Sequence, residues 1–119
     1  MVTHPFSISW AEVESRFHEF NELSRLASTV SHMLRLVSAL REDPRFSQFG
    51  HWFSALALIV SDADRLVSVA WSEPGGVGWA GEEGFAVRRV DFQNSKSWDL
   101  VVVDERDVAA TILERLKLP

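Results

Sequence analysis

The stretch that decides the fold spans residues 8–41 and reads ISWAEVESRFHEFNELSRLASTVSHMLRLVSALR. Its start carries a helix-initiation signal, because the Ser9 hydroxyl can accept a hydrogen bond from the amide of Glu12, whose side chain can reach back. Helical spacing continues to Arg41, and Pro44 follows soon after. Since the residue before a proline is pushed away from helical geometry, the segment should end there. The sequence therefore predicts roughly 32 residues of helix.

The apolar face of this segment changes direction near Asn21. At about 100° per residue, Trp10, Phe17 and Phe20 share one face, whereas the leucine-rich face of residues 23–40 is rotated by roughly a third of a turn. Two structures fit this pattern. Either the helix breaks near Asn21 and both pieces pack on one core, or it stays straight.

A straight helix would have consequences beyond the chain itself. It would be ~48 Å long, whereas a domain of this length has a radius of gyration near ~13.5 Å. Such a helix would overhang its own domain and would need a partner, most simply a second copy packed through the aromatic face. The pattern thus leaves a homodimer open as an alternative.

The rest of the chain predicts strands followed by a second helix. Residues 53–60 are apolar on both alternating faces, as in a central buried strand. Asp104 resembles a helix N-cap ahead of apolar residues at helical spacing. Short connections favour antiparallel neighbours. The four expected strands are residues 53–60, 65–71, 84–92 and 98–103.

We therefore expect one α+β domain over residues 1–119. It should contain an N-terminal helical segment of one or two helices, a four-stranded antiparallel meander, and a C-terminal helix packed on one sheet face. The composition agrees, since 119 residues with 46% apolar and 24% charged residues is the balance of a chain that buries a single core.

Composition also excludes several classes of function. The chain has no cysteine, which removes thiol catalysis and thiolate metal sites and fits a reducing compartment, so we expect a cytoplasmic protein. Residues 1–20 lack a signal-peptide pattern, and no apolar run approaches the ~20 residues that span a bilayer. The net charge of −5 argues against nucleic acid, because Arg88 and Arg89 form the only adjacent basic pair. It favours a protein partner with a basic or neutral surface.

The glycine-rich segment 76–81 matches the spacing of a dinucleotide-binding loop. That fingerprint requires a helix to begin at once, so that its amides meet the phosphates. Here a strand-like segment begins at Gly84, and Glu82 and Glu83 would repel phosphate. We therefore expect a hairpin connection and no nucleotide cofactor. Trp79, within it, is either an exposed contact anchor or packs back on Trp71.

No metal site or catalytic group stands out. The histidines lie at positions 4, 18, 32 and 51, and only Glu14 and His18 share a helical i, i+4 spacing. A metal needs three or four converging ligands, so none is expected. The paired carboxylates occupy turns and helix starts, where structural roles suffice.

The aromatic content favours a binding function. Five tryptophans and eight phenylalanines in an acidic chain are the ingredients of a protein-binding surface. We expect a non-enzymatic module that occludes a partner protein, as a toxin-neutralising immunity protein, a secretion chaperone or an adaptor does. The expected contact residues are Trp79, Glu82 and Glu83, joined by Trp10, Phe17 and Phe20 if the helix stays straight.

Two other classes remain as alternatives. One is a small-ligand or weakly catalytic pocket between the sheet and the first helical segment, with His51, Asp91 or Asp99 as its polar groups. The other is a self-associating structural module.

Overall fold

The computed structural model describes residues 7–21, 24–76, 78–91 and 93–117. Three α-helices and five strands make up this part of the chain. The helices are α1 (Trp10–Glu19), α2 (Ala27–Glu42) and α3 (Glu105–Lys117), and short 3-10 turns η1 (Ser24–Leu26) and η2 (Pro44–Phe46) flank α2. The strands are β1 (Gly50–Ser54), β2 (Ala57–Asp62), β3 (Arg65–Ser72), β4 (Gly84–Asp91) and β5 (Lys96–Val103).

The strands form one antiparallel sheet in the order β1-β2-β3-β4-β5. The α+β class, the meander and the C-terminal helix match the sequence prediction, but the predicted number of four strands was wrong. The segment expected as one strand, residues 53–60, contains the end of β1, a tight turn and the start of β2. Ala55 and Leu56 make that turn with φ angles of 50° and 67°. Such turns normally use Asn-Gly, so Ala-Leu gave no turn signal.

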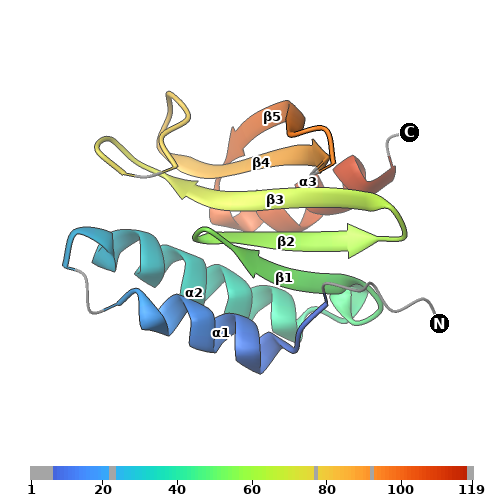
Figure 1. Ribbon diagram of the computed structural model, residues 1–119, viewed down its shortest axis with the longest axis horizontal. Helices are drawn as coiled ribbons and strands as arrows, with labels where there is room; N and C mark the ends of the chain where they lie inside the picture. The colour runs from blue at the N-terminus through green and yellow to red at the C-terminus, as the bar shows by residue number, and fades with distance from the viewer. Residues whose placement is uncertain (1–6, 22–23, 77, 92, 118–119) are drawn as a thin grey trace.

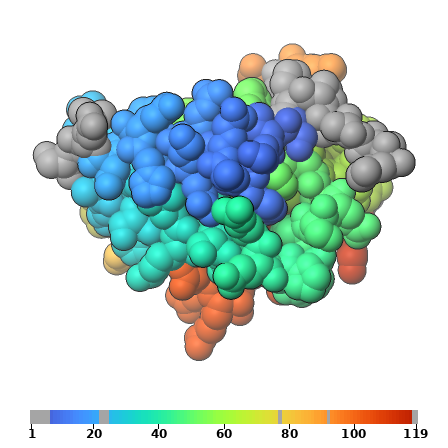
Figure 2. Space-filling view, turned by 90° about the horizontal axis from the view of Figure 1, so that it is seen from below, coloured from blue at the N-terminus to red at the C-terminus, as the bar shows by residue number. Residues whose placement is uncertain are grey.

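The N-terminal helical segment is broken into two helices, which is the first of the two structures that the sequence allowed. The Ser9 hydroxyl caps α1 by accepting from the Glu12 amide at 3.1 Å. Phe20 ends α1, and α2 returns antiparallel beside it (Figures 1 and 2). The longest dimension of the described chain is 40 Å, shorter than the ~48 Å of a straight helix over the whole segment.

One core joins the three helices to a single face of the sheet. Because side chains alternate along a strand, Leu58, Val60, Val67, Val69, Phe85 and Val87 share this face, and all of them are buried. Val13 and Phe17 of α1, Met33 and Val37 of α2, and Val108 and Ile112 of α3 fill the same cluster. The opposite face carries Ile59, Ser68, Ala70 and Arg88. No helix in the described part of the chain packs on it, and we call it the helix-free face.

Strand β5 forms one edge of the sheet and is irregular. Its pairing with β4 shifts register between Val87 and Arg89, and Asp99 takes a positive φ of 55°. The Arg115 Nε of α3 donates to the Asp99 carbonyl at 3.1 Å. Trp98 is 39% exposed on this strand, and the Arg89 guanidinium lies 5.3 Å from its ring centroid. Helix α3 is therefore tied to the backbone of the edge strand.

Candidate functional site

The connection between β3 and β4, residues 73–83, is held in place by one serine. Ser72, at the end of β3, is fully buried. Its hydroxyl accepts from the Ala80 amide at 2.9 Å and donates to the Glu82 carbonyl at 2.6 Å. Both backbone groups belong to the returning arm of the loop. The arm that carries Trp79 is therefore fixed to the sheet, although five of the six glycines lie at residues 75–84.

Two further contacts hold the outgoing arm of this β3–β4 loop. The Ser28 hydroxyl on α2 donates to the Glu73 carboxylate at 3.0 Å, and the Gly76 amide donates to the Glu73 carbonyl at 3.0 Å. Gly78 lies so close to β3 that a Cβ atom there would sit 2.8 Å from the Trp71 carbonyl oxygen. Only glycine permits that approach.

The predicted contact residues on this loop reach solvent. Trp79 is 48% exposed, and Glu82 and Glu83 are exposed beside it. Trp71, on which Trp79 could have packed, has other ring partners. It stacks on His32 with ring centroids 3.6 Å apart, and its edge meets Phe85 at 5.0 Å. The loop therefore presents an aromatic side chain flanked by two carboxylates.

A polar hollow of about 350 Å³ opens beside the loop. His32, Trp71, Glu83, Asp104 and Glu105 are among its walls. The His32 Nδ1 lies 2.8 Å from the Ser28 carbonyl oxygen, which can only accept, so Nδ1 is the donor of this hydrogen bond. Within the described residues, no three His, Asp or Glu side chains are grouped so that they could hold a metal ion.

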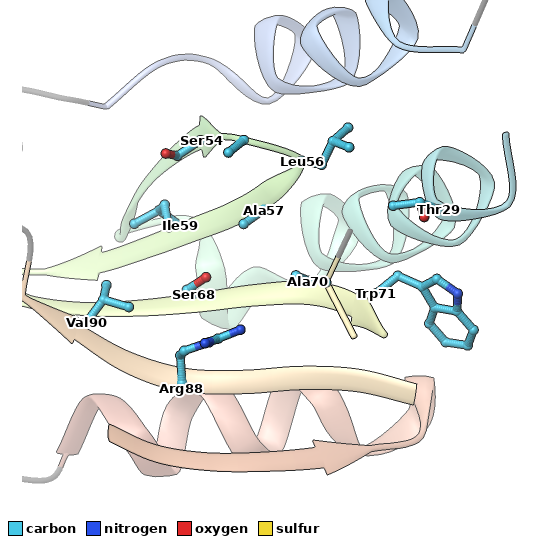
Figure 3. Close-up of a pocket in the computed structure, with 12 residues that line it drawn as sticks. Thr29, Ser54, Leu56, Ala57, Ile59, Ser68, Ala70, Trp71, Arg88 and Val90 are labelled. Atoms are coloured by element: carbon cyan, nitrogen blue, oxygen red, sulfur yellow. The ribbon is translucent and has the colours of Figure 1, made fainter. Parts of the chain in front are cut away.

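A second hollow, of about 270 Å³, is called here the trough; it opens on the helix-free face and reaches the end of the sheet, where Leu56 and the α2 residue Thr29 also line it. Its walls include Ser54, Ile59, Ser68, Ala70 and Arg88 (Figure 3). Gly78 of the β3–β4 loop and Trp71 also line it. The trough thus adjoins the loop that carries Trp79, and Trp71 lines both hollows.

The aromatic residues of α1 pack within this chain. Phe17 is 0% exposed and meets the ring of Phe53 edge-on at 4.8 Å. Phe20 lies 5.8 Å from the same ring, and Trp10 stacks on His51 at 4.0 Å. Trp10, Phe17 and Phe20 were assigned to a partner surface on the condition of a straight helix. That condition is not met, and these aromatics pack against the first strand.

The polar groups expected for a catalytic or ligand pocket lie apart. His51 is on β1 at one edge of the sheet, and Asp99 is on β5 at the other. Burial lowers the pKa of His51 below its ordinary value. Asp91 accepts from the Asn94 side chain at 2.6 Å, which lowers its pKa and keeps it ionised. The structure does not assemble these three residues into one site.

Sequence reasoning missed Ser72 and did not single out Arg88 as a site residue, although it placed Arg88 and Arg89 on opposite sides of their strand. Strand alternation puts Arg88 on the helix-free face, whereas Arg89 turns toward α3 and donates to the Arg115 carbonyl at 3.3 Å. The period of two in residues 84–91 was the available signal for that separation. Nothing in the sequence marks Ser72, because its role depends on the path of a loop.

Comparisons with known proteins find no matching family model, and no curated protein or solved structure is significantly similar to this chain. The helices of the described residues are all too short or too polar to cross a bilayer. The function is therefore inferred from the geometry of the site itself.

Proposed function

We propose that this chain is a non-enzymatic protein-binding module that occludes a surface of its partner through the β3–β4 loop. The observation that carries the proposal is the exposure of Trp79 on an arm that Ser72 holds to the sheet. A loop backbone that is already fixed loses little conformational entropy when its side chain enters a partner's pocket. Tryptophan is also enriched among the residues that dominate binding energy.

The charge around Trp79 indicates the chemistry of the partner. Glu82 and Glu83 are exposed next to it, and the chain has a net charge of −5. A partner with a basic or neutral surface would be attracted to this loop and held in register. Immunity protein, secretion chaperone and adaptor are the roles that use such occlusion, and a cytoplasmic location belongs to the same proposal.

Affinity capture from the native source tests this function. Tagged wild-type protein should capture a partner in stoichiometric amount. Trp79→Ala should weaken binding roughly 30-fold or more, as expected for a central aromatic anchor. Trp98→Ala is the matched control, because Trp98 is also exposed, at 39%, but lies on β5.

Two results would contradict the proposal. One is the absence of any stoichiometric partner for the wild-type chain. The other is a partner whose affinity falls with Trp98→Ala and is unchanged by Trp79→Ala. Glu82→Lys combined with Glu83→Lys should slow association with a basic partner, and added salt should reduce that difference.

A further inference from the structure

The trough on the helix-free face is lined by one cation, by small polar and apolar side chains, and by the larger apolar side chains of Leu56, Ile59, Trp71 and Val90. Strand register places Ile59, Ser68 and Arg88 side by side on neighbouring strands. Ala57 and Ala70 lie next to this row, and their short side chains leave space above the sheet for the hollow of about 270 Å³. Figure 3 shows the Arg88 side chain extending from β4 toward β3, where Ser68 lies.

Arg88 has no carboxylate partner in the described part of the chain. The ion pairs found there use Arg35, Arg41, Arg45, Arg106 and Arg115. No hydrogen bond within the described residues involves the Arg88 guanidinium either. Among those residues, Arg88 lacks these partners even though the chain contains more acidic residues, 17, than basic ones, 12. Arg88 is half-buried, and an arginine stays protonated whatever its surroundings. Its charge is therefore partly desolvated and available to an anion.

The surroundings of Arg88 favour an anion with an apolar part. The hydroxyls of Ser54 and Ser68 line the trough and make no hydrogen bond with another described residue. They can therefore donate to a ligand oxygen. Ile59, Ala57 and Ala70 offer an apolar floor beside them. A carboxylate matches the planar fork of a guanidinium and can accept two hydrogen bonds from it.

We propose that the trough binds a small monocarboxylate, with its carboxylate on Arg88 and Ser68 and its apolar stem over Ile59 and the alanines. The hollow is slightly smaller than the ~300–1,000 Å³ of pockets that take drug-sized ligands, so a short stem fits best. This site adjoins the β3–β4 loop but does not include Trp79, Glu82 or Glu83, and its occupancy does not depend on the proposed function of that loop.

Titration with hexanoate, followed by amide ¹H–¹⁵N correlation spectra, tests the site. Hexanoate should cause saturable shifts of the Ile59, Ser68 and Arg88 amides. The alcohol 1-hexanol has the same apolar stem without the carboxylate and should bind roughly ten-fold more weakly or not at all. Saturable shifts that are equal for the two probes, or shifts that never saturate, would overturn the proposal.

Variants of Arg88 distinguish specific binding in the trough from non-specific attraction of anions to any exposed arginine. Arg88→Gln should weaken hexanoate binding roughly ten-fold or more, and Arg88→Lys should recover it only in part, because an ammonium lacks the fork. Arg106→Gln is the control, since the Arg106 side chain is 83% exposed on α3. Equal losses in Arg88→Gln and Arg106→Gln would overturn the site.

A steric variant keeps the charge in place. Ala70→Leu should fill the floor and abolish saturable binding while Arg88 remains. If its spectrum shows that the sheet is disrupted, Ala57→Val provides the same obstruction from β2. Undiminished hexanoate affinity in a folded variant of either kind would contradict binding in the trough.

Discussion

The imidazole of His32 on α2 lies parallel to the indole of Trp71 on β3, with ring centroids 3.6 Å apart and ring planes 4° apart. The stack joins the second helix to the end of the strand from which the β3–β4 loop departs. The His32 Nδ1 is also held by the Ser28 carbonyl at 2.8 Å. The ring is thus fixed both by its hydrogen bond and by its neighbour.

Removal of this stack should destabilise the fold. We expect His32→Ala to lower the free energy of unfolding by about 1–2 kcal/mol, because a stacked aromatic pair contributes beyond the area that it buries. His18→Ala is the control, since His18 is an exposed helical histidine on α1. It should change stability by less than ~0.5 kcal/mol. Urea denaturation of the variants measures both, and equal effects would contradict the role of the stack.

The loop anchor at Ser72 gives a second prediction. Ser72→Ala removes both hydrogen bonds and leaves the Ala80 amide and the Glu82 carbonyl without their partner. We expect a loss of about 1–3 kcal/mol in the free energy of unfolding, together with faster hydrogen exchange of the Ala80 amide. Ser47→Ala serves as the control, because Ser47 is exposed while its hydroxyl donates to the Pro44 carbonyl. An unchanged exchange rate at Ala80 would show that Ser72 does not order the loop.

His51 should make stability depend on pH. Its pKa in the folded chain is lowered from the ordinary value of 6.5, chiefly because burial disfavours the charged ring. The unfolded chain therefore takes up this proton first as the pH falls. Stability should be full above pH 6.5 and decrease below it, by less than ~1.4 kcal/mol per pH unit.

His51→Phe isolates this contribution. Phenylalanine keeps a ring beside Trp10, which stacks on His51 at 4.0 Å, but it does not titrate. Melting temperatures from pH 7.5 down to pH 5 should fall less for His51→Phe than for the wild type. His18→Gln is the control, because it replaces an exposed histidine on α1. An identical pH profile for His51→Phe and wild type would refute the assignment.

Phe17 distinguishes a core role from an interface role. It is 0% exposed, so Phe17→Ala should cost about 3–5 kcal/mol, the usual range for deletion of a core phenylalanine. Phe20→Ala should cost less, because Phe20 is only partly buried. Light scattering after size-exclusion chromatography tests the alternative that Phe17 lies in a homodimer interface. A stable dimer that becomes a stable monomer in Phe17→Ala would favour the interface role.

The sequence predicted those elements whose signals are local. Ser9 and Glu12 marked the start of α1, and the rotation of the apolar face near Asn21 marked the end of the first helical piece. Pattern alone left the break undecided, because the choice depends on whether Phe17 meets this chain or another. In the structure Phe53 of β1 supplies that contact, and its position is a tertiary property.

The two main omissions have different physical causes. The β1–β2 turn was missed because Ala55 and Leu56 adopt left-handed backbone angles that these residue types rarely take. The trough was missed because it depends on which strands are neighbours. Arg88 meets Ser68 through strand pairing, and an unaligned sequence does not disclose that register.

The irregular β5 edge has a consequence for the behaviour of the chain in concentrated solution. A regular, unpaired edge strand offers a template on which other chains can add strands and grow into fibrils. Here Asp99 takes a left-handed backbone conformation beside the register shift, and the Arg115 side chain donates to the Asp99 carbonyl. Trp98 and Leu100 remain exposed on the same strand. The irregular backbone and the occupied carbonyl therefore hinder other copies of the chain from adding a strand at this apolar edge.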